Sequence, residues 1–110
     1  MKKSRALDAL AALANDTRLD IIRQLVPAGR DGLSAGDIGK TVKLPASRLS
    51  FHLAALDNAG LVSSRRESRN IIYTVEYKTL GGVFGYLMND CCGAHPEICA
   101  CLSPKTSPAP

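Results

Sequence analysis

The sequence of 110 residues contains no tryptophan, and its aromatic residues make up only 5% of the chain. No apolar run approaches the roughly 20 residues that a transmembrane helix requires. Near the N-terminus, Asp8 interrupts the apolar stretch that follows the basic residues, and the run left from Ala9 to Ala14 is too short for the apolar region of a signal peptide. We therefore expect a cytoplasmic protein without membrane-spanning segments.

Cysteine is absent until position 91, and all four cysteines then fall in one short segment, "NDCCGAHPEICACL". In the reducing cytoplasm, clustered thiols bind metals or react more often than they form structural disulfides. Cys91 and Cys92 are poorly placed to pair with each other, because a trans peptide holds their Cα atoms about 3.8 Å apart and disulfides usually need about 4.4–6.8 Å. The segment is therefore a candidate metal-binding or redox-active site.

The rest of the chain has the size of one domain and is rich in Ala and Leu, which favour helices. Periodicity and capping residues predict helices over residues 4–14, 16–26, 34–42, 45–59 and 79–92, and strands over 61–66 and 70–77. This order predicts a winged helix-turn-helix, a mainly α (α+β) fold with a two-stranded β-hairpin wing.

Two proline–glycine combinations are expected to interrupt the helices. Pro27 and Gly29 should end the second helix, and Gly93 and Pro96 should prevent any regular helix after Cys92. The composition of the last residues predicts disorder. We therefore expect a DNA-binding and dimerisation domain over residues 1–92 and a partly disordered, cysteine-bearing tail over residues 93–110.

The fourth predicted helix would lie in the major groove of DNA. Its leucines at 49, 53 and 56 face the core, so steps of about 100° per residue direct other side chains outward. Phe51 would contact a thymine methyl group, and the hairpin arginines would grip phosphates, although arginines also serve merely to protect a hairpin edge. For His52, a structural role or a simple phosphate contact is expected. The candidate DNA-binding residues are Ser47, Arg48, Ser50, Phe51, His52, Arg65, Arg66 and Arg69.

The stretches "LANDTRLDIIRQL" and "LPASRLSFHLAALDNAGLVSSRRESRNIIYTV", with the amphipathic helix that follows, resemble the ArsR/SmtB family of bacterial metalloregulatory repressors. The resemblance covers roughly residues 5–92, and its most specific part runs from Ser47 to Tyr73. It implies a homodimeric repressor, not an enzyme, that metal releases from operator DNA, most simply an inverted repeat. The first and last helices would form the dimer interface, with Leu7, Leu10, Leu80, Phe84 and Leu87 as its candidate residues.

The inducer site must differ from two patterns of that family. The stretch "GLSAGDIG" lacks the cysteines of many arsenic sensors, and Asp90 and His95 lack the spacing of the zinc ligands. Some members with a comparable cysteine-rich tail respond to arsenic, and three thiolates suit trivalent arsenic or antimony, whereas structural zinc takes four ligands, typically as C-x₂₋₄-C pairs. Arsenite, methylarsenite and antimonite are thus the expected inducers, bound by Cys91 and Cys92 with either Cys99 or Cys101.

Several alternatives stay open from the sequence alone. A disulfide between one of the first two cysteines and one of the last two would make a redox-responsive repressor. A divalent zinc, cadmium or lead site could add His95 to the thiols. A thiol-dependent arsenate reductase is a less favoured reading, since only His95, Asp90 and Glu97 accompany the thiols and a nucleophilic cysteine needs a base or an anion-binding loop. A winged helix used only for protein contacts is the remaining alternative.

Overall fold

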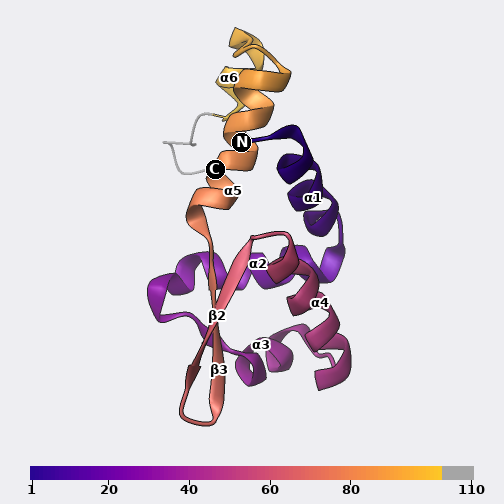
Figure 1. Cartoon of the computed structure of the whole chain (residues 1–110), viewed down its shortest axis with the longest axis vertical. Helices are drawn as coiled ribbons and strands as arrows, with labels where there is room; N and C mark the ends of the chain where they lie inside the picture. Colours follow the sequence, from indigo (N-terminus) through magenta and orange to yellow (C-terminus); the bar gives the residue numbers. More distant parts are fainter. Residues whose placement is uncertain (103–110) are drawn as a thin grey trace, which may run out of the picture.

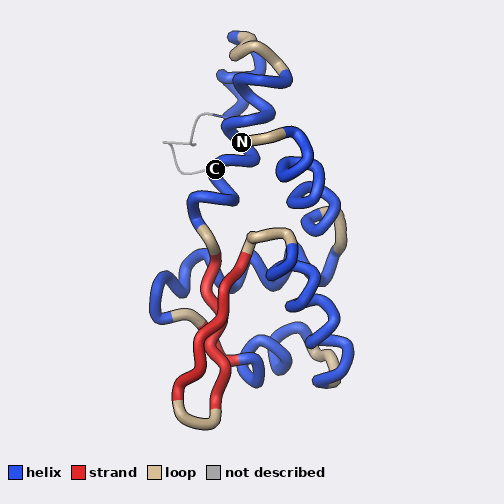
Figure 2. Tube along the Cα trace, in the orientation of Figure 1, coloured by secondary structure: helices blue, strands red, loops and turns tan. Residues whose placement is uncertain are grey.

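The computed structural model describes residues 1–102 of the chain. It contains the helices and strands of a winged helix-turn-helix, with α3 and α4 as the helix-turn-helix and the β2–β3 hairpin as the wing (Figures 1 and 2). In chain order the elements are α1 (Lys3–Leu13), α2 (Asp16–Ala28), a 3₁₀ turn (Gly29–Asp31), β1 (Leu33–Ser34), α3 (Ala35–Val42), α4 (Ala46–Asn58), β2 (Val62–Glu67), β3 (Asn70–Val75), α5 (Tyr77–Gly85), a π-helical turn (Tyr86–Cys91) and α6 (Pro96–Leu102).

Side chains that predict the helix ends from the sequence also cap them in the structure. The Asn15 side chain accepts a hydrogen bond from the backbone N–H of Arg18, and the Ser34 hydroxyl accepts one from Asp37, so both open a helix as N-caps. Gly60 adopts a φ of 76° just beyond α4, which a residue with a Cβ rarely does. These local signals explain why the predicted helices of the DNA-binding half are confirmed.

The sheet has one strand more than the expected hairpin. β3 pairs antiparallel with β2 along the wing, and β1 adds two residues to its other edge, with Leu33 opposite Tyr73. A strand of two residues has no alternating pattern to recognise, because that pattern needs at least four residues. The extra strand joins the wing to the residues just before α3.

One face of each helix from α1 to α5 closes a single hydrophobic core. The leucines of α4 at positions 49, 53 and 56 are buried, as predicted, and pack with residues of α2, α3 and the base of the wing. The buried Val83 ties α5 to the same core, and buried alanines place α1 close beside α5. None of the helices within residues 1–102 is long and apolar enough to cross a membrane.

The expectation that Pro27 ends the second helix is wrong by a small margin. Pro27 lies inside α2, which runs to Ala28 and ends where Gly29 adopts a φ of 66°. Pro27 has no N–H to donate to the carbonyl of Arg23, one turn earlier, so it removes one hydrogen bond from the last turns of α2. The carbonyl of Val26 lies in the last turn, where the helix itself offers no donor, and the Tyr77 hydroxyl donates to it at 2.6 Å.

The expectation that no regular helix follows Cys92 is also wrong. The chain reverses at Gly93 and Ala94, both with positive φ, and then forms α6. Pro96 is the first residue of α6, a position where the missing N–H costs nothing because the first turn has no intrahelical acceptor for it. The predicted disorder at residues 103–110 lies outside the described residues.

The molecule is elongated, with extents of 48 × 39 × 23 Å. The tip of the wing lies at one end of the long axis, and α6 lies at the other, beyond the end of α5 (Figure 1). The cysteine segment is therefore far from the predicted DNA-binding surface and does not contact it directly.

Candidate nucleic-acid interface and thiol site

The outer face of α4 is free to contact DNA. Ser47, Arg48, Ser50 and Phe51 are all exposed, and Phe51 keeps 66% of its surface in solvent. A large apolar side chain so exposed at the centre of a basic and hydroxylated face suits contact with a thymine methyl group in the major groove. The structure thus brings four of the predicted helix residues together on one surface.

Arg18 of α2 adds to this surface, and sequence reasoning missed it. Its Nε donates a hydrogen bond to His52 Nδ1 at 3.2 Å, and its guanidinium carbon lies 5.7 Å from the centre of the Phe51 ring. These residues are more than thirty positions apart, so no local pattern in the sequence could connect them. The arginine extends the positive charge of α4 onto α2.

His52 is half-buried rather than part of the free outer face. Burial, followed by the charges of Arg18 and Arg48, lowers the pKa of His52 below its ordinary value, and its Nδ1 accepts a hydrogen bond only while it is unprotonated. His52 therefore positions Arg18 beside the recognition helix.

The lowered pKa of His52 predicts a pH dependence of folding. A histidine whose pKa is lower in the folded than in the unfolded chain stabilises the fold above its unfolded pKa of about 6.5, and that contribution falls as the pH drops below this value. We expect urea unfolding to show a larger loss of stability between pH 7.5 and 5.5 for the wild type than for His52→Gln. Equal losses in the two proteins would contradict the assignment.

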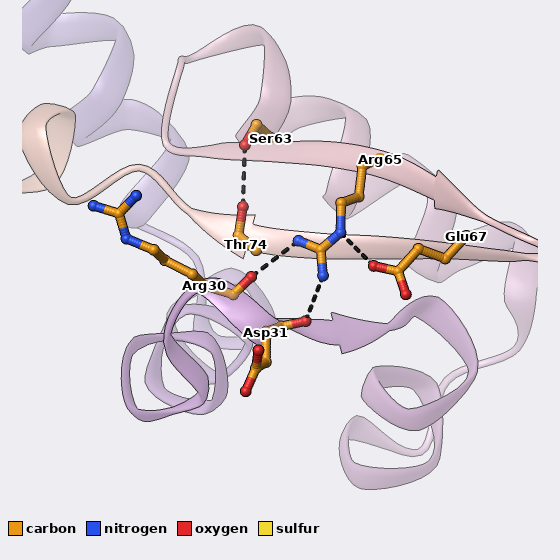
Figure 3. A network of polar contacts seen from close by, with 6 residues as sticks. All are labelled: Arg30, Asp31, Ser63, Arg65, Glu67 and Thr74. Carbon is orange, nitrogen blue, oxygen red and sulfur yellow. Dashed lines mark hydrogen bonds and ion pairs between the residues drawn. The ribbon is translucent and has the colours of Figure 1, made fainter.

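The wing arginines fall into two groups. Arg65 Nη1 donates to the backbone carbonyl of Arg30 and Nη2 to that of Asp31, each at 2.9 Å, and Nε donates to Glu67 (Figure 3). The side chains of Arg66 and Arg69 are exposed and make no hydrogen bond or ion pair with other side chains or the backbone of residues 1–102. Arg65 therefore anchors the wing to the 3₁₀ turn, and the other two remain available for phosphates.

Substitution of these arginines should separate anchoring from phosphate binding. Arg66→Gln should reduce the slope of log affinity against log salt by about 1, because a lost phosphate contact releases fewer counterions. Arg65→Gln should leave that slope unchanged and lower the free energy of unfolding by about 1 kcal/mol through its lost hydrogen bonds. DNA titrations at several salt concentrations, together with urea unfolding, measure both quantities. A reduced slope for Arg65→Gln would return Arg65 to the phosphate-binding group.

The predicted dimer residues fall into two groups, one exposed and one packed against the core. Leu7 and Phe84 are 54% and 53% exposed, on α1 and α5 respectively. Leu10, Leu80 and Leu87 are only half-buried and pack against the core. Exposed large apolar side chains on two adjacent helices are typical of a surface that a partner covers.

The four cysteines lie on two neighbouring elements and are not assembled into one site. Cys91 is the last residue of the π-helical turn and Cys92 follows it, and hydrogen bonding of the Cys92 S–H to the Cys91 side chain is the main cause that raises the pKa of Cys92. Cys99 is half-buried and lines a groove between α5 and α6, whereas Cys101 is exposed. Within residues 1–102, no three side chains of the metal-binding kinds are close enough together to hold an ion. The thiols suit a soft ion chemically, but a third thiol would have to move toward the first two.

Several known proteins are similar to this chain in sequence and in fold. A family model described as "Helix-turn-helix domain" matches residues 13–65. The HTH-type transcriptional regulator YgaV of Escherichia coli is 32% identical over 88 residues, which cover 80% of this chain and 87% of YgaV. The solved structure of HlyU from Vibrio cholerae is 33% identical, with a TM-score of 0.64 over 83% of this chain and 99% of HlyU. An ArsR-like transcriptional regulator from Rhodococcus sp. RHA1 is 26% identical, with a TM-score of 0.71 over 89% of this chain and 90% of that one.

These similarities define a DNA-binding transcriptional regulator rather than an enzyme. The chain belongs to the ArsR/SmtB family of helix-turn-helix regulators.

Proposed function

We propose that this regulator is a homodimeric repressor, that it binds an inverted-repeat operator, and that trivalent arsenic or antimony releases it through the C-terminal thiols. The observation that carries the proposal is the arrangement of the cysteines around the end of α5. Cys91 and Cys92 are consecutive residues at the end of the π-helical turn, and α6 places Cys99 in a groove against α5. A trivalent metalloid takes three thiolates, and α6 would have to move to bring a third thiol to the pair.

The same surface connects the thiols to the proposed dimer. The groove beside Cys99 is also lined by Gly81, Phe84 and Gly85 of α5 and by Leu102 of α6. Because Phe84 belongs to the proposed interface, moving α6 against α5 changes the surface that the second copy meets. The two recognition helices of a dimer must match half-sites one helical turn apart, so a change at the interface alters DNA affinity.

The test is fluorescence anisotropy of labelled promoter DNA, titrated first with the protein and then with arsenite, methylarsenite, antimonite, cadmium or zinc. A coupling of about 1–3 kcal/mol, typical of allosteric proteins, corresponds to a loss of DNA affinity of about 5–150-fold. Chromatographic mass measurement gives the oligomeric state in the same buffer. Release by cadmium and zinc but not by arsenite would overturn the metalloid assignment and leave the regulator itself intact.

Proton release separates divalent-metal binding from metalloid binding. Arsenous acid and three thiols give the thiolate complex and three molecules of water, so neutral reactants exchange no net proton with the solution. A divalent ion instead displaces one proton from each thiol that it binds, and its affinity rises with pH. Release by arsenite should therefore change little between pH 6.5 and 8, whereas release by cadmium should strengthen steeply.

A redox-responsive repressor is the second candidate function, favoured by the free thiols on two neighbouring elements, the end of the π-helical turn and α6. Hydrogen peroxide that released DNA as efficiently as arsenite, with loss of two free thiols per chain, would support this alternative.

A further inference from the structure

A cleft lies between the helix-turn-helix and the wing, well away from the cysteines. Its walls come from α3, from the turn after it, from α4 and from β3. Its volume of about 440 Å³ falls within the range of about 300–1,000 Å³ that is usual for small-molecule sites. The proposed function uses the outer face of α4, the dimer surface and the thiols, and the cleft is not needed for it.

The cleft is open because α3 carries two glycines. A Cβ at Gly36 would meet only the Ser34 hydroxyl, 3.9 Å away, and a Cβ at Gly39 would lie 3.2 Å from a methyl group of Leu49. Glycine inside a helix costs about 1 kcal/mol relative to alanine, so two of them in so short a helix weaken it considerably. Gly36 therefore leaves empty a space that an ordinary side chain could fill.

The lining has an apolar floor and a basic rim. The buried Leu49 and Leu53 form the floor, and Ile71 of the wing, 45% exposed, stands at the edge. Lys40 and Lys43 supply two ammonium groups, and no Asp or Glu lines the cleft. This charge balance favours an anionic ligand with an apolar body over a neutral or cationic one.

Two hydroxyl groups complete the polar part of the lining, those of Ser50 and Tyr73. Burial, and to a lesser extent the charge of Asp57, raises the pKa of Tyr73 above its ordinary value, so its phenol stays protonated and can donate a hydrogen bond. A carboxylate beside the lysines would accept hydrogen bonds from such donors.

We propose that this cleft binds a small apolar carboxylate, with its hydrocarbon body on Leu49 and Leu53 and its carboxylate between Lys40 and Lys43. Ser50 lies both in this cleft and on the face of α4 predicted to bind DNA. A bound carboxylate also neutralises positive charge beside that face. The ligand therefore opposes DNA binding, independently of the thiols, and gives the regulator a second input.

Octanoate is a suitable probe, and two-dimensional NMR of the ¹⁵N-labelled full chain locates it. The amides of Gly36 and Gly39 report on this cleft, and those of Gly81 and Gly85 report on the groove between α5 and α6. We expect octanoate to shift the first pair with a Kd of roughly millimolar order, as the size of the ligand suggests. Octylammonium, which has the same body and the opposite charge, should bind far more weakly. Equal binding of the two probes, or shifts confined to Gly81 and Gly85, would overturn the proposal.

Variants test the site without relying on DNA. Gly36→Leu fills the cleft and should abolish the octanoate shift at Gly39, while Gly81→Leu, a matched change at another helical glycine with open space, should leave it intact. Lys40→Gln and Lys43→Asn should each weaken binding by about twofold to fivefold, as expected for an exposed ion pair. Unchanged octanoate binding by Gly36→Leu would contradict the proposal for this cleft. It would leave the proposed function of the thiol site unaffected.

Discussion

Replacing Cys99 by serine should abolish the release from DNA by arsenite, and replacing Cys101 should preserve most of it. Cys99 is half-buried and faces α5, where Cys91 and Cys92 end the helix, whereas Cys101 is exposed. In the wild type, arsenite should lower DNA affinity by about 5–150-fold, and in Cys99→Ser by less than about twofold, because the coupling is lost. Anisotropy of the labelled promoter DNA measures the effect.

The control is the DNA affinity without arsenite, which should be the same in the wild type and both variants, since none of these residues lies near α4. If Cys101→Ser loses the response and Cys99→Ser keeps it, Cys101 is the third ligand. If Cys99→Ser, Cys101→Ser and Cys92→Ser all keep the response to arsenite, the metalloid does not act through this segment.

Replacing Leu56 by alanine should lower the free energy of unfolding by about 2–5 kcal/mol, because it removes a fully buried side chain and leaves a cavity. Phe51, five residues earlier on the same helix, is mostly exposed. Phe51→Ala should change stability by no more than about 0.5 kcal/mol, as is usual for a surface position. Urea unfolding of the two variants measures the contrast.

The two variants should rank in the opposite order for DNA affinity, measured under conditions in which both proteins are folded. Phe51→Ala should bind its operator more weakly by about 1–3 kcal/mol, the range for a lost base contact, with little change in affinity for unrelated DNA. Such a loss spread equally over all sequences would mean that Phe51 does not contact a base. A large loss of stability in Phe51→Ala would mean that the side chain packs in the core.

Local patterns were sufficient to predict the DNA-binding half of the fold. The spacing of Leu49, Leu53 and Leu56 fixes which face of α4 is buried, and Asn15 and Ser34 mark where helices begin. Each of these signals acts within four residues of the chain, which is the range over which helical periodicity and capping operate.

The features that sequence reasoning missed depend on contacts between distant residues. The hydrogen bonds from Arg65 to the turn before β1, and from Arg18 to His52, join residues more than thirty positions apart. The sequence placed Arg65 among the phosphate-binding arginines because its position on the hairpin was visible and its partners were not. α6 escapes prediction for another reason: a proline after a glycine suggests a break in the helix, although a proline at the first position of a helix favours its start.

The shortness of α6 has a consequence for inducer sensitivity. α6 spans Pro96–Leu102 and contains no buried residue, and isolated helices shorter than about 12–15 residues are marginal in water. The fraction of molecules in which α6 is free to rearrange is therefore substantial at equilibrium. Apparent ligand affinity is the intrinsic affinity scaled by the population of the competent state. Under the proposed function, a weakly held α6 would let the regulator respond at inducer concentrations close to those set by the thiols themselves.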